Sequence, residues 1–526
     1  MFMINCETWL ELNAHYQALY RIPLKQLFLE NPNRFQQFSL EVADIFVDYS
    51  KNIVIQETID LLCAFAQQRK LPEAINALFS GEKLNYSENR SALHTVLRLP
   101  AHKKFILDGI DLLSDVQNQF QKMARIALQL EKKELKGYSG KPIDTILHVG
   151  MGGSGLGPAL YYQSVDRAEK NATCHFFTEF DYVAIQAKLA LCNPETTIAV
   201  IVSKSFTTQD TLIISNTIKS WFCNAAGNEA KIQSHFYAVT AVCERAKALH
   251  FLDEHILKIA DWVGGRYSIW SAVSFSVILS LGVKNFQRFL HGAHQIDLNF
   301  QHEPFKKNMP VIMALLDVWY NNFFHTQTRA IVPYSSRLSA LPSYLQQLHM
   351  ESLGKSVTAK GEKINYATGC VIWGDVGPSS QHSFHQLLMQ GSQMIPVDFI
   401  LPLRDGELND YDLKRAAYCL SQSQTLMQGF DAPTAMQTIQ GNRPSTTLLM
   451  QELTPEALGA LLALYEHKVF AKSILWGINA FDQWGVERGK QVAQALIGCM
   501  TENKKCDSVD SSTSGLLEKV SRSLLV

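Results

Sequence analysis

A chain of 526 residues exceeds what one hydrophobic core usually organises, so the sequence predicts at least two packed units and excludes a single small binding module. Its composition, 47% hydrophobic and 18% charged residues, is typical of a soluble globular protein, and 48 basic against 49 acidic side chains leave almost no net charge. This balance predicts that neither nucleic acid nor a membrane is a partner.

The first ten residues lack a basic region followed by a continuous apolar stretch, which a cleaved secretion signal requires. We therefore expect the protein to stay in the cytoplasm. Its ten cysteines are scattered from Cys6 to Cys506 without a C-x-x-C pair. That pattern favours reduced thiols over a disulfide framework.

The N-terminal region predicts helices, because segments such as 41–66 repeat apolar residues at spacings of three and four with little strand signal. Further on, residues 144–149 predict a short apolar strand, followed by a glycine loop and a helix. A second strand is expected over 196–202, followed by a hydroxyl-rich turn and a helix over 209–221. Repeated strand–loop–helix units predict a parallel sheet covered by helices.

An uncharged run over 267–283 is slightly too short for a comfortable membrane span and is interrupted by serines, so it predicts a buried helix. A second α/β region is expected from about 286 to 498, with strands over 329–333 and 369–373. The polar stretch 501–515 is the only low-complexity segment.

The first motif is Gly150-Met-Gly-Gly-Ser-Gly155, which satisfies G-x-G-x-x-G between a predicted strand and a predicted helix. Three interpretations remain open for this motif alone. The loop can bind an anion or a sugar through its backbone N–H groups, it can bind a dinucleotide with Glu179 or Asp181 as the acidic partner, or it can be a structural turn.

The second motif, Ser203-Lys204-Ser205-Phe206-Thr207-Thr208, also follows a predicted strand and precedes a helix. Four hydroxyls, one cation and a helix N-terminus together suit a terminal phosphate monoester. The alternative is helix capping, with Thr207 as the N-cap and Asp210 three residues on. Capping requires only one of the four hydroxyls.

Four further segments contain side chains that could carry chemistry. Arg266 follows two glycines and precedes an apolar segment, where it could stabilise developing negative charge or pair with a structural carboxylate. Glu351 lies among apolar residues and could act as a base, although most glutamates are solvated. His382 and His385 are one helical turn apart, yet no third ligand accompanies them, so we expect no metal. Lys490 follows an aromatic, glycine-bearing stretch; the alternative is an exposed helix lysine.

Six segments resemble, in order and in spacing, those of the glucose-6-phosphate isomerase family. The most specific of them surround Arg266 and run over 481–490; the resemblance spans Gly150 to Lys490. It implies an α/β fold of two sugar-isomerase (SIS) type domains, each a parallel sheet sandwiched by helices, with N-terminal helices and a C-terminal arm. The expected divisions are 1–115 for the N-terminal helical region, 116–285 and 286–500 for the two α/β domains, and 501–526 for the tail.

The resemblance also implies roles and partners. Glucose 6-phosphate and fructose 6-phosphate would be interconverted without a cofactor or metal, in a homodimer with shared active sites. Glu351 would be the base, Arg266 would stabilise the charged intermediate, and His382 with Lys490 would open the sugar ring. The substrate and its phosphate would be bound by Gly153, Ser154, Ser203, Lys204, Ser205, Thr207, Thr208 and Gln347.

The sequence departs from the common family pattern at Leu353, at Pro378-Ser-Ser380 and at Met389, and none of these changes removes a proposed catalytic group. Two other functions remain to be separated from isomerisation. One is a dinucleotide-dependent sugar-phosphate oxidoreductase, suggested by the glycine loop. The other is a sugar-phosphate sensor without activity, because related domains also occur in regulators.

Overall fold

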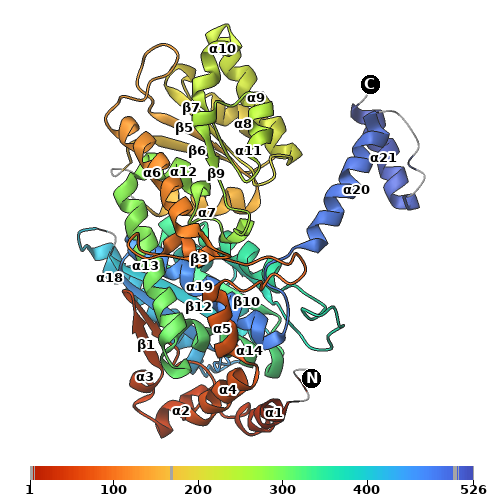
Figure 1. The fold of residues 1–526 in the computed structure, drawn as a ribbon. Helices are drawn as coiled ribbons and strands as arrows, with labels where there is room; N and C mark the ends of the chain where they lie inside the picture. Colours follow the sequence, from red (N-terminus) through yellow and green to blue (C-terminus); the bar gives the residue numbers. More distant parts are fainter. Residues whose placement is uncertain are drawn as a thin grey trace. The chain divides into compact units, whose positions relative to one another are not determined.

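The computed structural model describes residues 4, 6–165, 170–404, 406–501, 506 and 509–524. The chain divides into two compact units, Met1–Ala480 and Phe481–Val526. The first unit contains two large sheets in separate halves, with helices packed on both faces of each (Figure 1). The predicted α/β class with two helix-covered, largely parallel sheets is therefore confirmed.

The first sheet has five strands in the order β6-β5-β7-β8-β9, and all neighbours are parallel. The first strand in sequence, β5, lies inside the sheet with β6 on one side and β7 on the other, so the order of connection reverses between β5 and β7. Ligands of such sheets bind at this switch point, outside the carboxyl ends of the strands. The strands are β5 (Thr145–Val149), β6 (Thr173–Phe177), β7 (Thr197–Val202), β8 (Phe236–Thr240) and β9 (Ile256–Lys258).

Apolar side chains of the first sheet are covered by helices on either side, and the predicted strands over 144–149 and 196–202 are confirmed as β5 and β7. The predicted helix after β7 is also confirmed and extends to Ala226. The helices of this half are α6 (Leu112–Glu131), α7 (Leu156–Ser164), α8 (Tyr182–Leu189), α9 (Gln209–Ala226), α10 (Glu229–Ile232), α11 (Cys243–Ala248) and α12 (Phe275–Leu281).

The second sheet has the order β1-β2-β13-β12-β10-β11. Its four C-terminal strands are parallel, and the hairpin β1–β2 is added antiparallel to β13. The strands are β1 (Ser39–Val42), β2 (Ile45–Asp48), β10 (Thr328–Pro333), β11 (Val371–Gly374), β12 (Val397–Arg404) and β13 (Ser445–Glu452).

The hairpin corrects the expectation that residues 41–66 are helical, because only Gln56–Gln68 forms a helix there. Ala43 and Asp44 both have positive φ, as the tight turn of a two-residue hairpin requires. Burial along β2 alternates, with Ile45 and Val47 directed into the core. Pairing with β13 therefore overrides a local pattern that also fits a helix.

The remaining helices of the first unit surround these sheets. They are α1 (Glu7–Leu19), α2 (Leu24–Glu30), α3 (Arg34–Gln37), α4 (Gln56–Gln68), α5 (Leu71–Ser80), α13 (Val283–His302), α14 (Met309–Val318), α15 (Leu341–Gln346), α16 (Gly377–Ser380), α17 (His385–Gln390), α18 (Asp410–Gln428) and α19 (Pro455–Trp476). A short antiparallel pair, β3 (Ile106–Leu107) and β4 (Ile110–Asp111), precedes α6.

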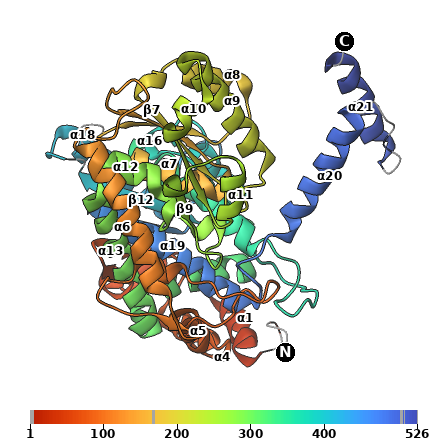
Figure 2. The same cartoon turned by 45° about the horizontal axis from the view of Figure 1, so that its top comes forward.

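Helix α19 runs through the middle of the first unit (Figures 1 and 2), and nearly all of its residues are buried. It packs against α13 at two glycines. A Cβ on Gly292 would lie 1.9 Å from the carbonyl oxygen of Glu456, and a Cβ on Gly459 would lie 1.9 Å from that of Phe289. Only glycine at both positions permits this close approach of the two helices.

The predicted buried helix over 267–283 is confirmed in burial but is wrong in extent. The segment starts with short 3₁₀ turns, only Phe275–Leu281 is α-helical, and Gly282 at φ +82° ends it. Its serines are buried, and those at 268, 271, 274 and 280 donate hydrogen bonds to backbone carbonyls. Among the described residues, no helix is long and apolar enough to cross a membrane.

A first buried ionic cluster, here called the Arg98 cluster, consists of Arg98, Asp297, Glu466 and His467. Arg98 binds both carboxylates at 2.6 Å and thereby joins the N-terminal region to α13 and α19. Burial raises the pKa of Glu466 to about 7, and Arg98 limits the rise. Burial disfavours the charged carboxylate, and the negative charge of Asp297 adds a smaller contribution in the same direction.

A second, here called the Asp317 cluster, consists of Asp317, Arg329, Asp398, Lys468 and Lys472. Asp317 lies 2.8 Å from Arg329, 3.0 Å from Lys468 and 2.6 Å from Lys472. Asp398 accepts a hydrogen bond from Arg329 at 2.6 Å. The cluster joins α14, β10, β12 and α19, and it holds three cations against two anions.

The second unit contains α20 (Trp484–Thr501) and α21 (Ser511–Leu524). A disulfide links Cys499 to Cys506, so the expectation of reduced thiols is wrong for this pair. The end of α20 brings the two Cα atoms to 5.8 Å, within the range that a disulfide spans. The other eight cysteines are free. Residues 502–505, 507–508 and 525–526 of the predicted tail lie outside the described residues.

We predict that Glu466→Gln makes stability less dependent on pH. Folded Glu466 holds its proton more tightly than the unfolded residue with its ordinary pKa of 4.5, so its contribution is fully present below about pH 4.5 and is lost as the pH rises through about 7. The loss is on the order of 1–3 kcal/mol. Urea unfolding of both proteins across this range measures it. Equal pH dependence of the two unfolding free energies would contradict the assignment.

Candidate active site

The glycine loop lies at the carboxyl end of β5, beside the switch point of the first sheet. It forms a 3₁₀ turn over Gly152–Ser154 and then enters α7. A Cβ on Gly150 would lie 2.5 Å from the Ser154 carbonyl oxygen, and a Cβ on Gly155 would lie 2.3 Å from that of Gly150. The loop therefore closes tightly on itself, which explains both glycines.

His148, in β5, supports this loop from inside the sheet. Its Nε2 lies 2.7 Å from the carbonyl oxygen of Ser154, and its Nδ1 lies 2.5 Å from the hydroxyl of Ser276. A carbonyl only accepts, so Nε2 donates and Nδ1 accepts from the serine. Burial lowers the pKa of His148 to about 4, which keeps the ring neutral. Sequence reasoning missed this residue, whose only signal was a polar side chain inside an apolar strand.

The glycine loop is in direct contact with the segment that carries Arg266. A Cβ on Gly153 would lie 2.3 Å from the carbonyl oxygen of Gly265 and 2.8 Å from the backbone nitrogen of Arg266. Gly152, at φ +53°, lies beside the side-chain amide of Gln347. Three predicted segments, far apart in sequence, therefore meet at this point.

Arg266 is buried and held by two hydrogen bonds. Its Nε donates to the hydroxyl of Ser352 at 2.6 Å, and its Nη2 donates to the carbonyl of Ala480 at 2.5 Å. Its Nη1 lies 3.7 Å from the Oε2 of Glu351. Tyr267 contacts the same Ser352 hydroxyl at 3.0 Å. Ser352 was not predicted, because no motif separates it from other serines.

Glu351 and Gln347 lie on a π-helical turn, Gln347–Glu351, that continues α15. The Gln347 side-chain amide donates to the Oε2 of Glu351 at 2.9 Å, as residues four apart on one helical face can. The Glu351 side chain is 21% exposed, whereas that of Arg266 is 3% exposed. The carboxylate thus borders solvent while its cationic neighbour does not. π-Helical turns of this kind are rare and occur frequently at functional sites.

The hydroxyl loop follows β7 on the other side of the switch point. The Ser203 hydroxyl lies 3.2 Å from that of Thr208, and the Ser205 hydroxyl lies 2.7 Å from that of Thr207. Phe206, at φ +52°, forms the turn at the centre of the loop, so that both hydroxyl pairs form across it. The N-cap of α9 is Thr208 and makes no side-chain capping bond, so the capping alternative with Thr207 is wrong.

Lys204 ties the hydroxyl loop to the segment that precedes Arg266. Its ammonium donates to the carbonyls of Asp261 at 2.7 Å and Val263 at 2.8 Å. Burial lowers the pKa of Lys204, and the positive charge of Arg90 lowers it further. The structure thus connects the hydroxyl loop to the same segment that the glycine loop contacts.

The other two predicted catalytic residues are His382 and Lys490. His382 is exposed at the turn between α16 and α17, and among the described residues no hydrogen bond or ion pair joins it to Glu351. Lys490 lies on α20 in the second unit, where its ammonium contacts Glu487 at 2.9 Å.

The structure also locates the residues considered for a metal and for a dinucleotide. His385 is buried and bonds to Ser380 and Gln422, and no group of potential metal ligands occurs among the described residues. Asp181, a candidate partner for a dinucleotide ribose, is the N-cap of α8 and accepts from the Ala184 backbone at 2.8 Å.

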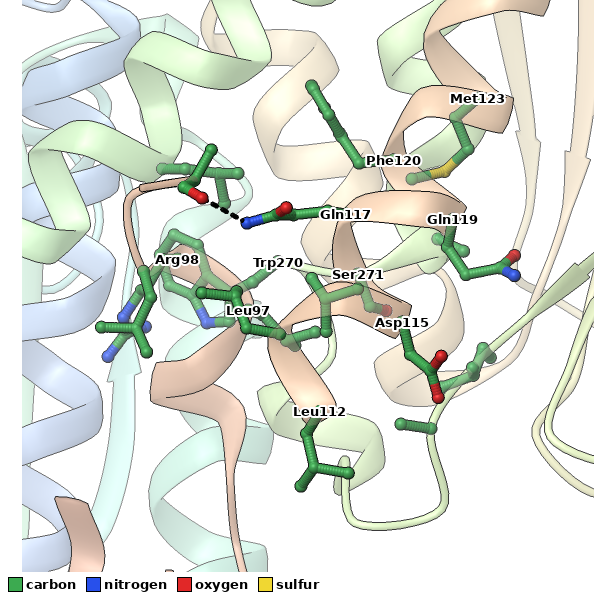
Figure 3. A pocket seen from close by; sticks show the side chains of 18 of the residues that line it. Leu97, Arg98, Leu112, Asp115, Gln117, Gln119, Phe120, Met123, Trp270 and Ser271 are labelled. Atoms are coloured by element: carbon green, nitrogen blue, oxygen red, sulfur yellow. Dashed lines mark hydrogen bonds between the residues drawn. The ribbon is translucent and has the colours of Figure 1, made fainter. Parts of the chain in front are cut away.

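A cavity of about 810 Å³ opens beside α6 in the first unit (Figure 3). Phe120 and Met123 of α6, together with Trp270, form part of its apolar lining. Gln117 donates to the Ala101 carbonyl at 2.8 Å across one side. None of the predicted site residues lines this cavity.

A sequence profile for the family described as Phosphoglucose isomerase matches residues 48–517. The chain belongs to the phosphoglucose isomerase family. The match includes every residue predicted for the site. It also confirms the family that the motifs resembled.

Relatives in this family match over almost the whole chain. A glucose-6-phosphate isomerase of Coxiella burnetii is 41% identical over 99% of this chain and 98% of its own length. One of Pseudomonas aeruginosa is 40% identical over 97% of this chain and 96% of its own. The crystal structure of a glucose-6-phosphate isomerase from Chlamydia trachomatis superimposes with a TM-score of 0.89 at 29% identity and covers both chains completely.

We predict that Gly153→Ala lowers kcat/KM for glucose 6-phosphate at least about tenfold, because the added Cβ would separate the glycine loop from Gly265 and Arg266. Gly498→Ala is the control, since a Cβ there meets open space on α20. Steady-state kinetics with thermal unfolding of each variant measure the effect. A fully active, normally stable Gly153→Ala enzyme would show that this contact does not organise the site.

Proposed function

We propose that this chain interconverts glucose 6-phosphate and fructose 6-phosphate as a reversible aldose–ketose isomerase of glycolysis and gluconeogenesis (EC 5.3.1.9). Support comes from the family and from the names of its relatives. The single structural observation that carries the proposal is the position of Gln347 and Arg266 beside the Glu351 carboxylate, next to the glycine loop. The reaction moves hydrogen within one molecule, so it consumes no oxidant or reductant.

Glu351 would transfer the proton between C2 and C1 of the open-chain sugar. A carboxylate on one face of the sugar takes the proton from C2, forms a cis-enediolate and returns the proton to C1. Gln347 would orient the carboxylate through its 2.9 Å hydrogen bond. The partial exposure of Glu351 supports this role, because a fully buried carboxylate could not meet a substrate.

Arg266 would stabilise the negative charge on oxygen in the enediolate. Its guanidinium is fixed by Ser352 and Ala480, so little reorganisation is needed when charge develops. His382, assisted by Lys490, would first open the sugar ring by protonating the ring oxygen while the anomeric hydroxyl loses a proton.

The phosphate would be bound by Ser203, Ser205, Thr207 and Thr208 at the N-terminus of α9, where hydroxyls and backbone N–H groups converge. Lys204 would add its charge from a position fixed by two carbonyls. Gly153 and Ser154 would contact the sugar through the glycine loop.

We also propose a cytoplasmic homodimer in which two subunits complete each active site. The exposed position of His382 supports this arrangement, because the residue is accessible to a second chain. The divisions 1–115, 116–285, 286–500 and 501–526 stay a prediction, to which the structure adds that the β1–β2 hairpin of the N-terminal region extends the second sheet.

A coupled assay on the purified protein tests the proposal. Glucose 6-phosphate should give fructose 6-phosphate without added nucleotide, and the reverse reaction should proceed equally without it. A strict requirement for NAD(P) would favour the oxidoreductase. Binding without hydrogen exchange at C2 would favour a sensor.

We predict that Glu351→Gln lowers kcat at least about a hundredfold with little change in KM, because the amide keeps the shape but cannot accept the proton. Glu362→Gln, which removes an exposed carboxylate from a loop, is the matched control and should stay fully active. Kinetics in both directions measure the loss. Near-normal turnover by Glu351→Gln would exclude this residue from proton transfer.

The shared-site model predicts recovery of activity when two inactive variants are mixed. In a hybrid of Glu351→Gln and His382→Ala subunits, one site carries both changes and the other carries neither. Equal mixing and refolding yield about half hybrids, so activity should recover to about a quarter of wild type. Hybrids that form, as native mass spectrometry can establish, but show no activity would place both residues in one subunit.

A further inference from the structure

The π-helical turn that carries Gln347 and Glu351 has an opposite face. Two positions along a helix correspond to about half a turn, so residue 349 lies opposite both side chains that form the candidate site. His349 occupies that position and is buried, whereas Met350 beside it is partly exposed. Whatever holds His349 therefore also controls the direction in which Glu351 points.

His349 packs against α19, beside the Asp317 cluster. Its ring lies edge-on to that of Tyr465, with 6.0 Å between the centroids. Burial lowers the pKa of His349 well below its ordinary value, and Lys472 and Lys468 lower it further. The imidazole is therefore neutral, with one donor and one acceptor nitrogen. Neither nitrogen hydrogen-bonds to any of the described residues.

The charges of the Asp317 cluster determine which kind of side chain is favourable at position 349. Arg329, Lys468 and Lys472 exceed Asp317 and Asp398 by one positive charge, so donors outnumber the carboxylate acceptors. Lys472 reaches Asp317 at 2.6 Å, and an ammonium has three protons to donate. A neutral acceptor beside the lysine pair complements this surplus without adding a charge to the interior, which a basic side chain at 349 would do.

We propose that His349 is a positioning residue for Glu351: its imidazole accepts a hydrogen bond from the lysine pair Lys468 and Lys472 through one water molecule, and so fixes the rotation of the π-turn. The inference rests on the proposed isomerase function, in which Glu351 is the base. It assigns the buried Asp317 cluster a second task besides joining α14, β10, β12 and α19. His349 itself does not touch the substrate.

Two substitutions at position 349 distinguish the effect of a hydrogen-bond acceptor from the effect of side-chain volume alone. His349→Leu removes the acceptor but keeps an apolar side chain, and it should lower kcat at least about tenfold while KM stays within about threefold. His349→Gln keeps an acceptor of similar reach and should retain kcat within about threefold of wild type. If the leucine variant does not fold, His349→Asn replaces it, since its shorter amide withdraws the acceptor from the lysines.

His235→Leu is the matched control. His235 is a buried histidine with two hydrogen bonds, to Thr197 and Tyr138, and it lies before β8 at the end of the sheet away from the switch-point loops. Its replacement should lower the melting temperature without changing kcat of the folded enzyme. If His349 had a purely structural role, His349→Leu would likewise lower the melting temperature and leave kcat of the folded enzyme unchanged.

Kinetics in both directions, with thermal unfolding, decide between the outcomes. A loss of kcat in His349→Leu that His349→Gln restores supports the inference. Unchanged kcat in His349→Leu, or equal losses in the leucine and glutamine variants, overturns it. A wild-type enzyme without isomerase activity would refute the proposed function itself, and this outcome is recognised before any variant is compared.

Discussion

The structure depends on the pairing of charges on one buried helix. Helix α19 lies inside the first unit, and its Glu466, Lys468 and Lys472 have no access to water. Isolated charges there would be prohibitive, so each is tolerable only with a partner: Glu466 with Arg98, and the two lysines with Asp317. These pairs fix α19 to the N-terminal region and to α14. Because charged pairs demand defined geometry where apolar contacts do not, they specify how these layers are assembled.

The candidate site depends on the topology of the first sheet. Parallel strands deliver their loops to one edge of the first sheet, and the reversal between β5 and β7 leaves room between the glycine loop and the hydroxyl loop. Glycines then allow backbones to touch, as Gly153 does at Gly265. Two side chains keep these loops in place: buried His148 supports the first loop, and half-buried Lys204 ties the second to the segment before Arg266. The candidate binding loops are thus held by close backbone contacts and by side chains that hydrogen-bond to the backbone.

Much of this was predictable from sequence, for identifiable reasons. Strands β5 and β7 were predicted because short apolar runs end in glycine or hydroxyl residues, and Arg266 and Glu351 because motifs surround them. The β1–β2 hairpin was missed because its turn at Ala43–Asp44 carries no glycine, and its apolar spacing also fits a helix. The π-turn was invisible because it differs from an α-helix in hydrogen bonding, not in residue spacing. The disulfide between Cys499 and Cys506 depends on where α20 ends, which no cysteine count reveals.

The distance between Arg266 and Glu351 determines what the pair can do. A direct two-point contact near 2.8 Å would occupy the carboxylate lone pairs with the guanidinium, as in a structural ion pair. At 3.7 Å the charges still attract, but the separation exceeds a hydrogen bond, so the carboxylate retains lone pairs for a proton from carbon. Ser352 and Ala480 maintain this separation, because they engage the guanidinium from its other side. In the proposed reaction the arginine would act on charge that develops in the substrate without neutralising the carboxylate beforehand.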